Sequence, residues 1–207
     1  MQPSIHQLIF SKDGNFSFII DNGCVYSFGK NDYGQLGLGD DYQKQTPTLI
    51  KTVAGVIDVS LGYIHSMILI HTGQVYTCGN NKYGQLGLGD NFHTNIPTLI
   101  QDIDNVIAIS ANFVHSMILT KGGQVYVCGN NYYGQLGLGD YNDRNIPVLI
   151  CNNIRSVSTG YNQSMIVTKD NQTYVFGRND CGQLGLGDNY CRNVPTLLSI
   201  KSKVQII

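Results

Sequence analysis

The stretch of this sequence that first suggests chemistry is a glycine-rich heptapeptide, GQLGLGD, at residues 84–90. Loops of this type bind phosphate groups when a helix begins directly behind them and supplies its free amides, and a P-loop adds a lysine. Here asparagine and threonine residues follow the aspartate, then the segment IPTLI, and no lysine stands at the P-loop position. The sequence therefore predicts no nucleotide-binding site and no cofactor.

Two histidine–serine pairs, at residues 65–66 and 115–116, contain the residue types of a general base and a nucleophile. Adjacent residues of a strand point to opposite faces of the sheet, so neither pair forms the hydrogen bond that such catalysis needs. The remaining histidines stand at no metal-ligand spacing from a cysteine or an acid; they are His6, His71 and His93. We therefore expect no catalytic residue and no metal site, and a protein that is not an enzyme.

The heptapeptide occurs four times, beginning at residues 34, 84, 134 and 182, and this repetition favours a building block over a single reactive site. Its glycines allow tight turns and close backbone approach, its leucines can fill a pocket between units, and its aspartate can accept hydrogen bonds from turn amides. The four aspartates should lie far apart, unlike the ligands of a calcium site. The residues of this structural loop are Gly34, Gln35, Gly37, Gly39, Asp40, Gly84, Gln85, Gly87, Gly89, Asp90, Gly134, Gln135, Gly137, Gly139, Asp140, Gly182, Gln183, Gly185, Gly187 and Asp188.

The sequence around each heptapeptide contains four short segments that are typical of strands, and none has the period of a helix. In the second unit these segments are residues 56–60, 66–70, 74–78 and 97–100. In every unit a short turn joins the second segment to the third. In the first unit this turn is Asn22-Gly23, a dipeptide that suits tight hairpins. An all-β fold of four propeller-type blades, each of four antiparallel strands, is therefore expected.

The chain is expected to form a single repeat domain over residues 1–207. Its approximate units are residues 1–50, 51–100, 101–150 and 151–200, and residues 201–207 match the start of a further inner strand. The pattern G-x-x-H-S-x-x-L, followed by V-Y-x-x-G-x-N-x-x-G-Q-L-G-L-G-D, resembles the repeat of the regulator of chromosome condensation family. Asn15 and Gln163 stand where the first and last units should carry the repeat histidine.

The resemblance implies a β-propeller, and the well-known members of the family close a ring of seven blades. Because this chain has four units, we expect an open arc or partial propeller, or one completed by another copy. A closed four-bladed ring is the alternative. Free sheet edges are unstable in isolation, so self-association through the open terminal blades is expected.

The composition excludes several classes of partner. Lysine and arginine number 13 against 14 acids, and only 13% of the residues are charged, so neither nucleic acid nor an anionic membrane finds a charged surface. The N-terminus does not read as a signal peptide, and no apolar stretch is long enough to span a membrane. We expect a soluble intracellular protein, in the cytoplasm or alternatively the nucleus. The six cysteines contain no C-x-x-C pair and are expected to be mostly buried thiols.

The residues that differ between units are the better candidates for binding. Directly after each heptapeptide comes an aromatic residue near a basic one, in loops that should share one rim of the propeller, and such residues are enriched at binding hot spots. The candidate partner-binding residues are Tyr42 with Lys44, Phe92 with His93, Tyr141 with Arg144, and Tyr190 with Arg192. The alternative is that these are partly buried loop anchors beside ordinary surface charges.

The functional hypothesis is a non-enzymatic protein–protein interaction module, a scaffold whose blade loops hold a protein partner. Two alternatives stay open. The resemblance implies guanine-nucleotide exchange on a small GTPase, although the chain has few blades and no evident protruding wedge. The chain could also be a truncated relic of a longer propeller protein.

Overall fold

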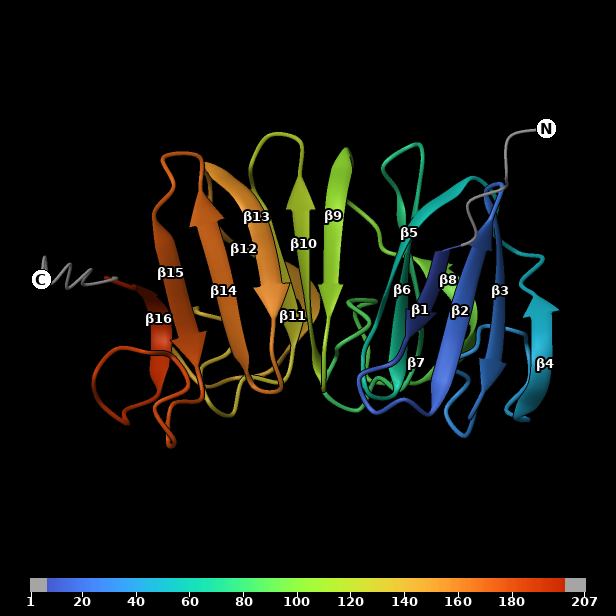
Figure 1. Cartoon of the computed structure of the whole chain (residues 1–207), viewed down its shortest axis with the longest axis horizontal. Coiled ribbons are helices and arrows are strands. Elements are labelled where there is room, and N and C mark those ends of the chain that lie inside the picture. The colour runs from blue at the N-terminus through green and yellow to red at the C-terminus, as the bar shows by residue number, and fades with distance from the viewer. Residues whose placement is uncertain (1–6, 200–207) are drawn as a thin grey trace, which may run out of the picture.

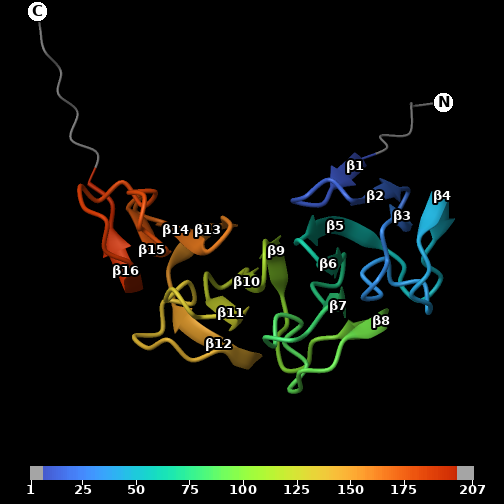
Figure 2. The ribbon, with the colours of Figure 1, turned by 90° about the horizontal axis from the view of Figure 1, so that it is seen from below.

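The computed structural model describes residues 7–199, which form strands and loops with no helix. Four sheets, each of four antiparallel strands, stand side by side in an arc (Figure 1). Seen from below, the arc is open on one side, with the first and fourth sheets at its two ends (Figure 2). The predictions of an all-β fold, four blades and an open arc are therefore confirmed. The alternative of a closed ring is wrong for the described residues.

Each sheet is a meander whose strands lie in the order of the sequence. The first sheet contains β1 (Gln7–Phe10), β2 (Phe16–Asp21), β3 (Cys24–Gly29) and β4 (Lys44–Leu49). The second contains β5 (Val56–Leu61), β6 (His65–Ile70), β7 (Val75–Gly79) and β8 (Thr94–Leu99). The third contains β9 (Val106–Ala111), β10 (His115–Thr120), β11 (Val125–Gly129) and β12 (Arg144–Cys151). The fourth contains β13 (Ile154–Thr159), β14 (Gln163–Thr168), β15 (Thr173–Gly177) and β16 (Arg192–Leu197).

The outer strands begin earlier than the sequence predicts. In the second sheet the strand starts at Thr94 rather than Pro97, and its pairing with β7 is irregular between Thr77 and Gly79. Proline cannot donate to a strand ladder, which makes it a natural boundary in sequence reasoning. On this outermost strand, however, the missing amide costs no inter-strand bond because one side of the strand has no neighbour in its sheet. The segment at 201–207, expected to start a further strand, lies outside the described residues.

Three hydrophobic cores lie between successive sheets, and each draws side chains from both. The strands β6 and β10 are buried along their whole length, because the sheets on either side cover both of their faces. In the second core, for example, Met67 and Leu69 of β6 pack with Ile118 of β10. The stability of each sheet thus depends on its neighbours.

The heptapeptide loop makes the polar part of the joint between sheets. In the second sheet Gln85 and Leu86 are buried, and the Gly89 amide donates to the carbonyl of Asn145 on β12 at 2.8 Å. Corresponding bonds join Gly39 to Asn95 and Gly139 to Asn193, also at 2.8 Å. Each of the first three loops therefore packs on the outer strand of the next sheet along the chain.

An asparagine before each heptapeptide holds the loop in shape. In the second sheet the Asn81 side chain donates to the Asp90 carbonyl at 2.9 Å and accepts from the Leu86 amide at 2.9 Å. Asn31, Asn131 and Asn179 make the same two bonds in the other sheets. The shape of the loop is thus fixed by bonds within its own sheet.

Strand register corrects the sequence alignment of the first unit. Phe16 pairs with Gly29 as His65 pairs with Gly79, so Phe16 rather than Asn15 holds the place of the repeat histidine. The reason is that the hairpin of the first sheet is one residue shorter, so counting back from the shared glycine lands one position early.

The expectation of mostly buried cysteines is wrong. Cys78 and Cys128 are buried at a strand position between sheets, whereas the other four are exposed or half-buried: Cys24, Cys151, Cys181 and Cys191. Cys24 follows a hairpin turn, and Cys181 precedes the heptapeptide loop at the end of the arc.

For the described part of the chain, no helix is long and apolar enough to cross a membrane.

The joint can be tested with two matched alanine substitutions. Gly84 and Gly182 have nearly the same positive φ, 80° and 74°, so alanine strains the backbone equally at both. A Cβ at Gly84 would overlap the Asn145 backbone, whereas at Gly182 its nearest contact is the Asn189 side chain at 3.3 Å. We expect Gly84→Ala to lower the free energy of unfolding by about 2 kcal/mol more than Gly182→Ala.

The measurement is equilibrium denaturant unfolding, at a concentration where the chain is monomeric. Equal losses in the two variants would show that backbone strain, and not the close approach of the sheets, requires glycine in this loop.

Candidate partner-binding surface

Two buried histidines link successive sheets. His65 Nε2 lies 3.0 Å from Ser116 Oγ, and His115 Nε2 lies 2.9 Å from Ser164 Oγ. Ser116 Oγ donates its proton to the Gln85 carbonyl at 2.8 Å. Because the serine proton is engaged there, the histidine must be the donor, which places its proton on Nε2. The Nδ1 atoms of both histidines are buried without a hydrogen-bond partner.

This cross-sheet pairing escaped the sequence argument, which considered only adjacent residues, but it does not suit nucleophilic catalysis. A general base must present a free nitrogen to the nucleophile, and here the facing nitrogen carries the proton. Burial lowers the pKa of His65 to about 3, with a smaller contribution from the charge of His115. Burial likewise lowers the pKa of His115 to about 4. Both rings are inaccessible to a substrate, so the pair serves the joint between sheets.

The structure places three of the predicted basic residues in contact with the heptapeptide loop, while Lys44 Nζ also lies 5.9 Å from the centroid of the Tyr42 ring. Lys44, Arg144 and Arg192 each form an ion pair with the heptapeptide aspartate four positions earlier, at 2.8 Å for Lys44 and Asp40. The hydrogen bond from Lys44 lowers the pKa of Asp40. The four aromatic side chains, by contrast, all extend into solvent; they are Tyr42, Phe92, Tyr141 and Tyr190.

The second sheet departs from this pattern. Thr94 stands at the position of Lys44, so the Asp90 carboxylate has no base four residues on. It keeps the two bonds that the other three aspartates also accept, from Asn81 Nδ2 at 3.1 Å and from the Phe92 amide at 3.0 Å. Asp90 therefore retains an exposed negative charge that the other three sheets neutralise internally.

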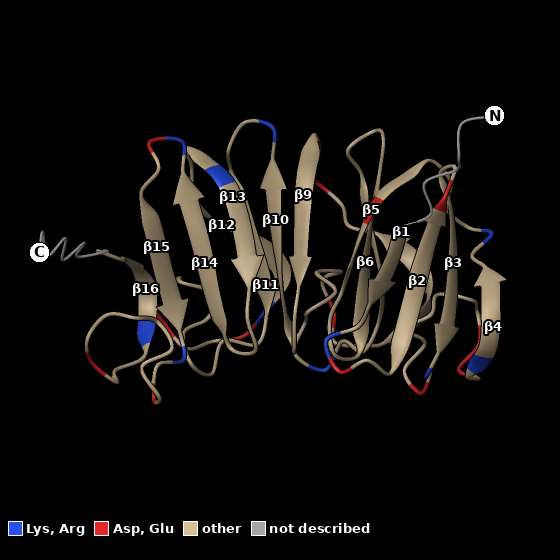
Figure 3. Ribbon diagram, in the orientation of Figure 1, with Lys and Arg blue, Asp and Glu red and all other residues tan. Residues whose placement is uncertain are grey.

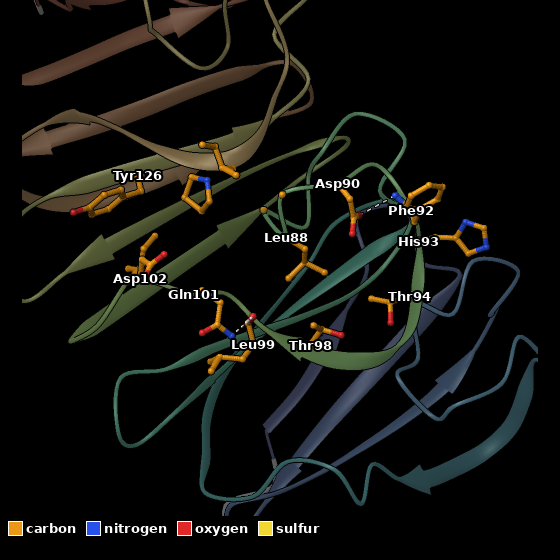
Figure 4. A pocket seen from close by; sticks show the side chains of 15 residues that line it. Leu88, Asp90, Phe92, His93, Thr94, Thr98, Leu99, Gln101, Asp102 and Tyr126 are labelled. Carbon is orange, nitrogen blue, oxygen red and sulfur yellow. Dashed lines mark hydrogen bonds between the residues drawn. The ribbon is translucent and has the colours of Figure 1, made fainter.

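A cleft of about 640 Å³ lies beside this acid, between the second and third sheets. Its apolar lining comes from residues on both sheets: Leu88, Phe92, Leu99, Ile103, Tyr126, Ile146 and Pro147. Its polar lining includes Asp90, His93, Thr94, Thr98, Gln101 and Asp102. Figure 4 shows Phe92 and His93 together on the loop at one end, with Tyr126 and Asp102 toward the other. Among the predicted pairs, Phe92 and His93 line this cleft.

Phe92 is the most exposed large apolar side chain of the described residues, at 79%. Single exposed apolar residues are common on protein surfaces, but an aromatic ring at the mouth of an apolar cleft suits a binding role. The arrangement offers an apolar floor, an aromatic edge and two carboxylates, and can hold a ligand segment that carries apolar and basic groups.

A second aromatic surface was missed by the sequence argument. Tyr63, Phe113 and Tyr161 follow one another along three successive sheets, with ring centroids 4.9 Å and 4.0 Å apart. Beside them lies a hollow of about 390 Å³ lined in part by Tyr132, Tyr133 and Arg178. We call Tyr63, Phe113 and Tyr161 the aromatic ladder. The sequence contains a signal for it, because each of its three residues stands two positions before the repeat histidine or its substitute.

Charged residues are sparse on the sheets and lie mainly in loops at the strand ends (Figure 3). Positive and negative groups are interspersed there, so no rim presents a field of one sign. In residues 7–199, no group of three or more histidine, cysteine or acidic side chains is placed to hold a metal ion.

The architecture defines the class of this protein: an open array of propeller-type blades joined by a repeated glycine-rich loop. The model of the RCC1-like domain family matches residues 14–207, so the chain belongs to that family. This confirms the resemblance to the regulator of chromosome condensation repeat.

The crystal structure of human WBSCR16 is similar, at 26% sequence identity and a TM-score of 0.78 over 88% of this chain and 49% of that one. Yeast RCC1 (Prp20), solved bound to Kap60, gives a TM-score of 0.84 at 22% identity over 98% of this chain and 50% of that one. The latter likeness shows the fold alone. Among curated proteins, mouse "Probable E3 ubiquitin-protein ligase HERC4" is 52% identical over 48 residues, which are 22% of this chain and 4% of that protein. The chain thus spans about half of these solved chains and a small part of the curated relative.

The buried histidines predict a specific dependence of stability on pH. Their folded pKa values lie below the ordinary value of 6.5, so the unfolded chain binds more protons between about pH 4 and 6.5. Stability is therefore full above pH 6.5 and is lost as the pH falls, by up to about 1.4 kcal/mol per pH unit for each histidine. We expect the variant with His65→Gln and His115→Gln to show a shallower slope between pH 6.5 and 4.5.

Glutamine is the appropriate replacement because Gln163 holds this register position in the fourth sheet. The measurement is the free energy of unfolding at each pH, with exposed His71→Gln as the control. If the double variant keeps the slope of the unsubstituted protein, the two histidines are not the groups that titrate.

Proposed function

We propose that this protein is a non-enzymatic interaction module that holds a segment of a protein partner in the cleft between its second and third sheets. The observation that carries the proposal is the placement of Phe92 and the unneutralised Asp90 at the mouth of an apolar cleft. A shaped apolar floor with a few placed polar groups is the usual form of a binding site.

The lining indicates the chemistry of the segment. Leu99, Ile103 and Tyr126 would receive an apolar side chain, and the Phe92 ring would contact the segment at the other end of the cleft. Asp90 and Asp102 would attract a lysine or arginine of the same segment. We therefore expect an extended peptide that combines an apolar anchor with a basic residue, presented by a protein inside the cell, in the cytoplasm or the nucleus. A second copy of the chain is a further expected partner, at the end sheets.

The relatives are consistent with a binding role but do not assign a partner. A yeast relative is described as having binding properties to Gsp1p and histones, and its 22% identity shows the fold alone. The similarity to the ubiquitin ligase covers 48 residues, about one repeat. No specific observation favours either alternative hypothesis, guanine-nucleotide exchange on a small GTPase or a truncated relic of a longer propeller.

The test uses two isoleucines of the third sheet with nearly equal exposure. Ile146 on β12 lines the cleft and is 55% exposed, whereas Ile107 on β9 lies outside it and is 53% exposed. Partners are captured from cell extract on the unsubstituted protein, identified by quantitative mass spectrometry, and then purified for calorimetric titration. We expect Ile146→Asp to weaken binding at least tenfold, a loss of about 1.4 kcal/mol or more, and Ile107→Asp to leave it unchanged.

A second pair of variants tests the electrostatic part. Asp90→Asn should weaken the same complex and reduce its salt dependence, while Asp140→Asn, at the ion-paired equivalent, should affect it less. A partner that binds all four variants equally would place the interface elsewhere. Absence of any specific partner, together with turnover across a broad substrate panel, would contradict the proposal itself.

A further inference from the structure

The two end sheets each present one half of the joint that holds the interior sheets together. We call the face of a sheet that packs on the following sheet its forward face, and the face that packs on the preceding sheet its backward face. Each interior joint therefore joins the forward face of one sheet to the backward face of the next. Met67 and Leu69 belong to the forward face of the second sheet, and Ile118 to the backward face of the third. Three such joints are present, so the same molecule shows how each face looks when it is covered.

The forward face of the fourth sheet is exposed where its counterparts are buried. Met165 holds the register position of Met67 and Met117, which are fully buried, yet it is 39% exposed. Gln183 and Gly185 of the last heptapeptide are exposed, whereas Gln85 and Gly87 are buried. Nothing lies within 4 Å of a Cβ built at Gly187, although the equivalent point at Gly89 meets Ile146 at 3.8 Å.

The backward face of the first sheet is exposed in the same way. Leu8 and Phe10 pair with β2 as Val59 and Leu61 pair with β6. Val59 and Leu61 are buried against the first sheet, but Leu8 and Phe10 are 49% and 61% exposed. Pro47 is exposed as well, whereas its counterpart Pro97 is buried beneath Gly37.

From this we infer that a second copy of the chain docks head to tail, with its first sheet on the fourth sheet of the first copy. The polar groups of a joint are in place on both faces. Gln163 carries an amide N–H at the position where His65 and His115 donate to a serine, and Ser17 holds the register position of that serine. Ser17 of the second copy would accept from Gln163 and donate to the Gln183 carbonyl, as Ser164 donates to Gln135 at 2.8 Å.

The remaining contacts also have a template within the chain. The amide of Gly187 would donate to the carbonyl of Gln45, as Gly139 donates to Asn193 at 2.8 Å. Phe28 stands where the second and third sheets carry a cysteine. The fourth sheet has Phe176 at that position, and this ring packs beneath Gly137 in the joint already formed. A phenylalanine is therefore compatible with the socket.

A second copy is the occupant that the observations favour, because both complementary faces are on one molecule. Each joint would bring together two different surfaces, and a two-fold axis would form the same joint twice, so that the dimer as a whole is isologous. Figure 2 shows the two end sheets flanking the open side of the arc, so two copies facing each other across a two-fold axis would form both joints at once. Pairing of like faces would bring two glycine-rich loops together, with no outer strand to receive either.

The experiment is size-exclusion chromatography with light scattering, combined with sedimentation equilibrium, on the full chain. The unsubstituted protein should have twice the mass of one chain. Met165→Glu and Phe10→Glu, placed on opposite ends of the arc, should each weaken association at least about tenfold, because each buries a charge in both joints. Mixed together, they should associate more tightly than either alone, because one copy's intact fourth sheet meets the other's intact first sheet.

Ile107→Asp, on the exposed part of an interior sheet, is the matched control and should leave the mass unchanged. Far-ultraviolet circular dichroism and thermal unfolding verify that each variant is folded. A monomer at every concentration would overturn the inference. Undiminished association of either variant alone would also overturn it, because this indicates pairing of like faces. A mixture of the two variants that associates no more tightly than either variant alone would overturn it as well.

Discussion

The structure depends on the joint between consecutive sheets. A four-stranded sheet cannot bury both of its faces alone, and β6 and β10 are apolar on both. The heptapeptide solves this by bringing the backbone of one sheet against the outer strand of the next, so closely that a Cβ at Gly84 would overlap Asn145. Glycine suits this position both because its φ is positive and because the contact is between backbones. The same requirement arises at every joint, which explains why the heptapeptide is the most repetitive part of the sequence.

The buried polar groups of the joint are arranged in a fixed direction of donation. His65 donates to Ser116, and Ser116 donates to the Gln85 carbonyl. This order fixes the tautomer of the imidazole and leaves Nδ1 without a partner in a place that water does not reach. An unpartnered buried nitrogen is tolerable only while the ring is neutral. The residues that look most like a catalytic pair are therefore held in the tautomer whose proton lies on the nitrogen facing the serine, so this nitrogen cannot accept the serine proton.

The repeat made the fold predictable, and the same repeat obscured parts of the site. The all-β class, the four units and the open arc followed from strand-like segments and turn dipeptides at fixed spacing. The pairing of His65 with Ser116 could not follow, because it joins residues 51 positions apart on different sheets. Nor could the ion pair of Lys44 with Asp40, which turns an expected contact residue into part of the loop. The aromatic ladder was accessible in principle, since Tyr63, Phe113 and Tyr161 share a repeat position. What was missing was the knowledge that this position faces solvent.

The constraint of the joint also explains where binding specificity can arise. A change at a glycine, at the glutamine or at the serine disturbs the contact between two sheets. The base four positions after the aspartate lies outside that contact, as Thr94 shows: the second sheet keeps its joint to the third, with Gly89 still bonded to Asn145. Because Thr94 replaces the base, the Asp90 carboxylate beside the apolar cleft has no ion pair with the residue four positions later, and the packing between the sheets is kept. A repeat protein built from nearly identical joints can therefore distinguish one of its clefts from the others only through residues that the joint does not use.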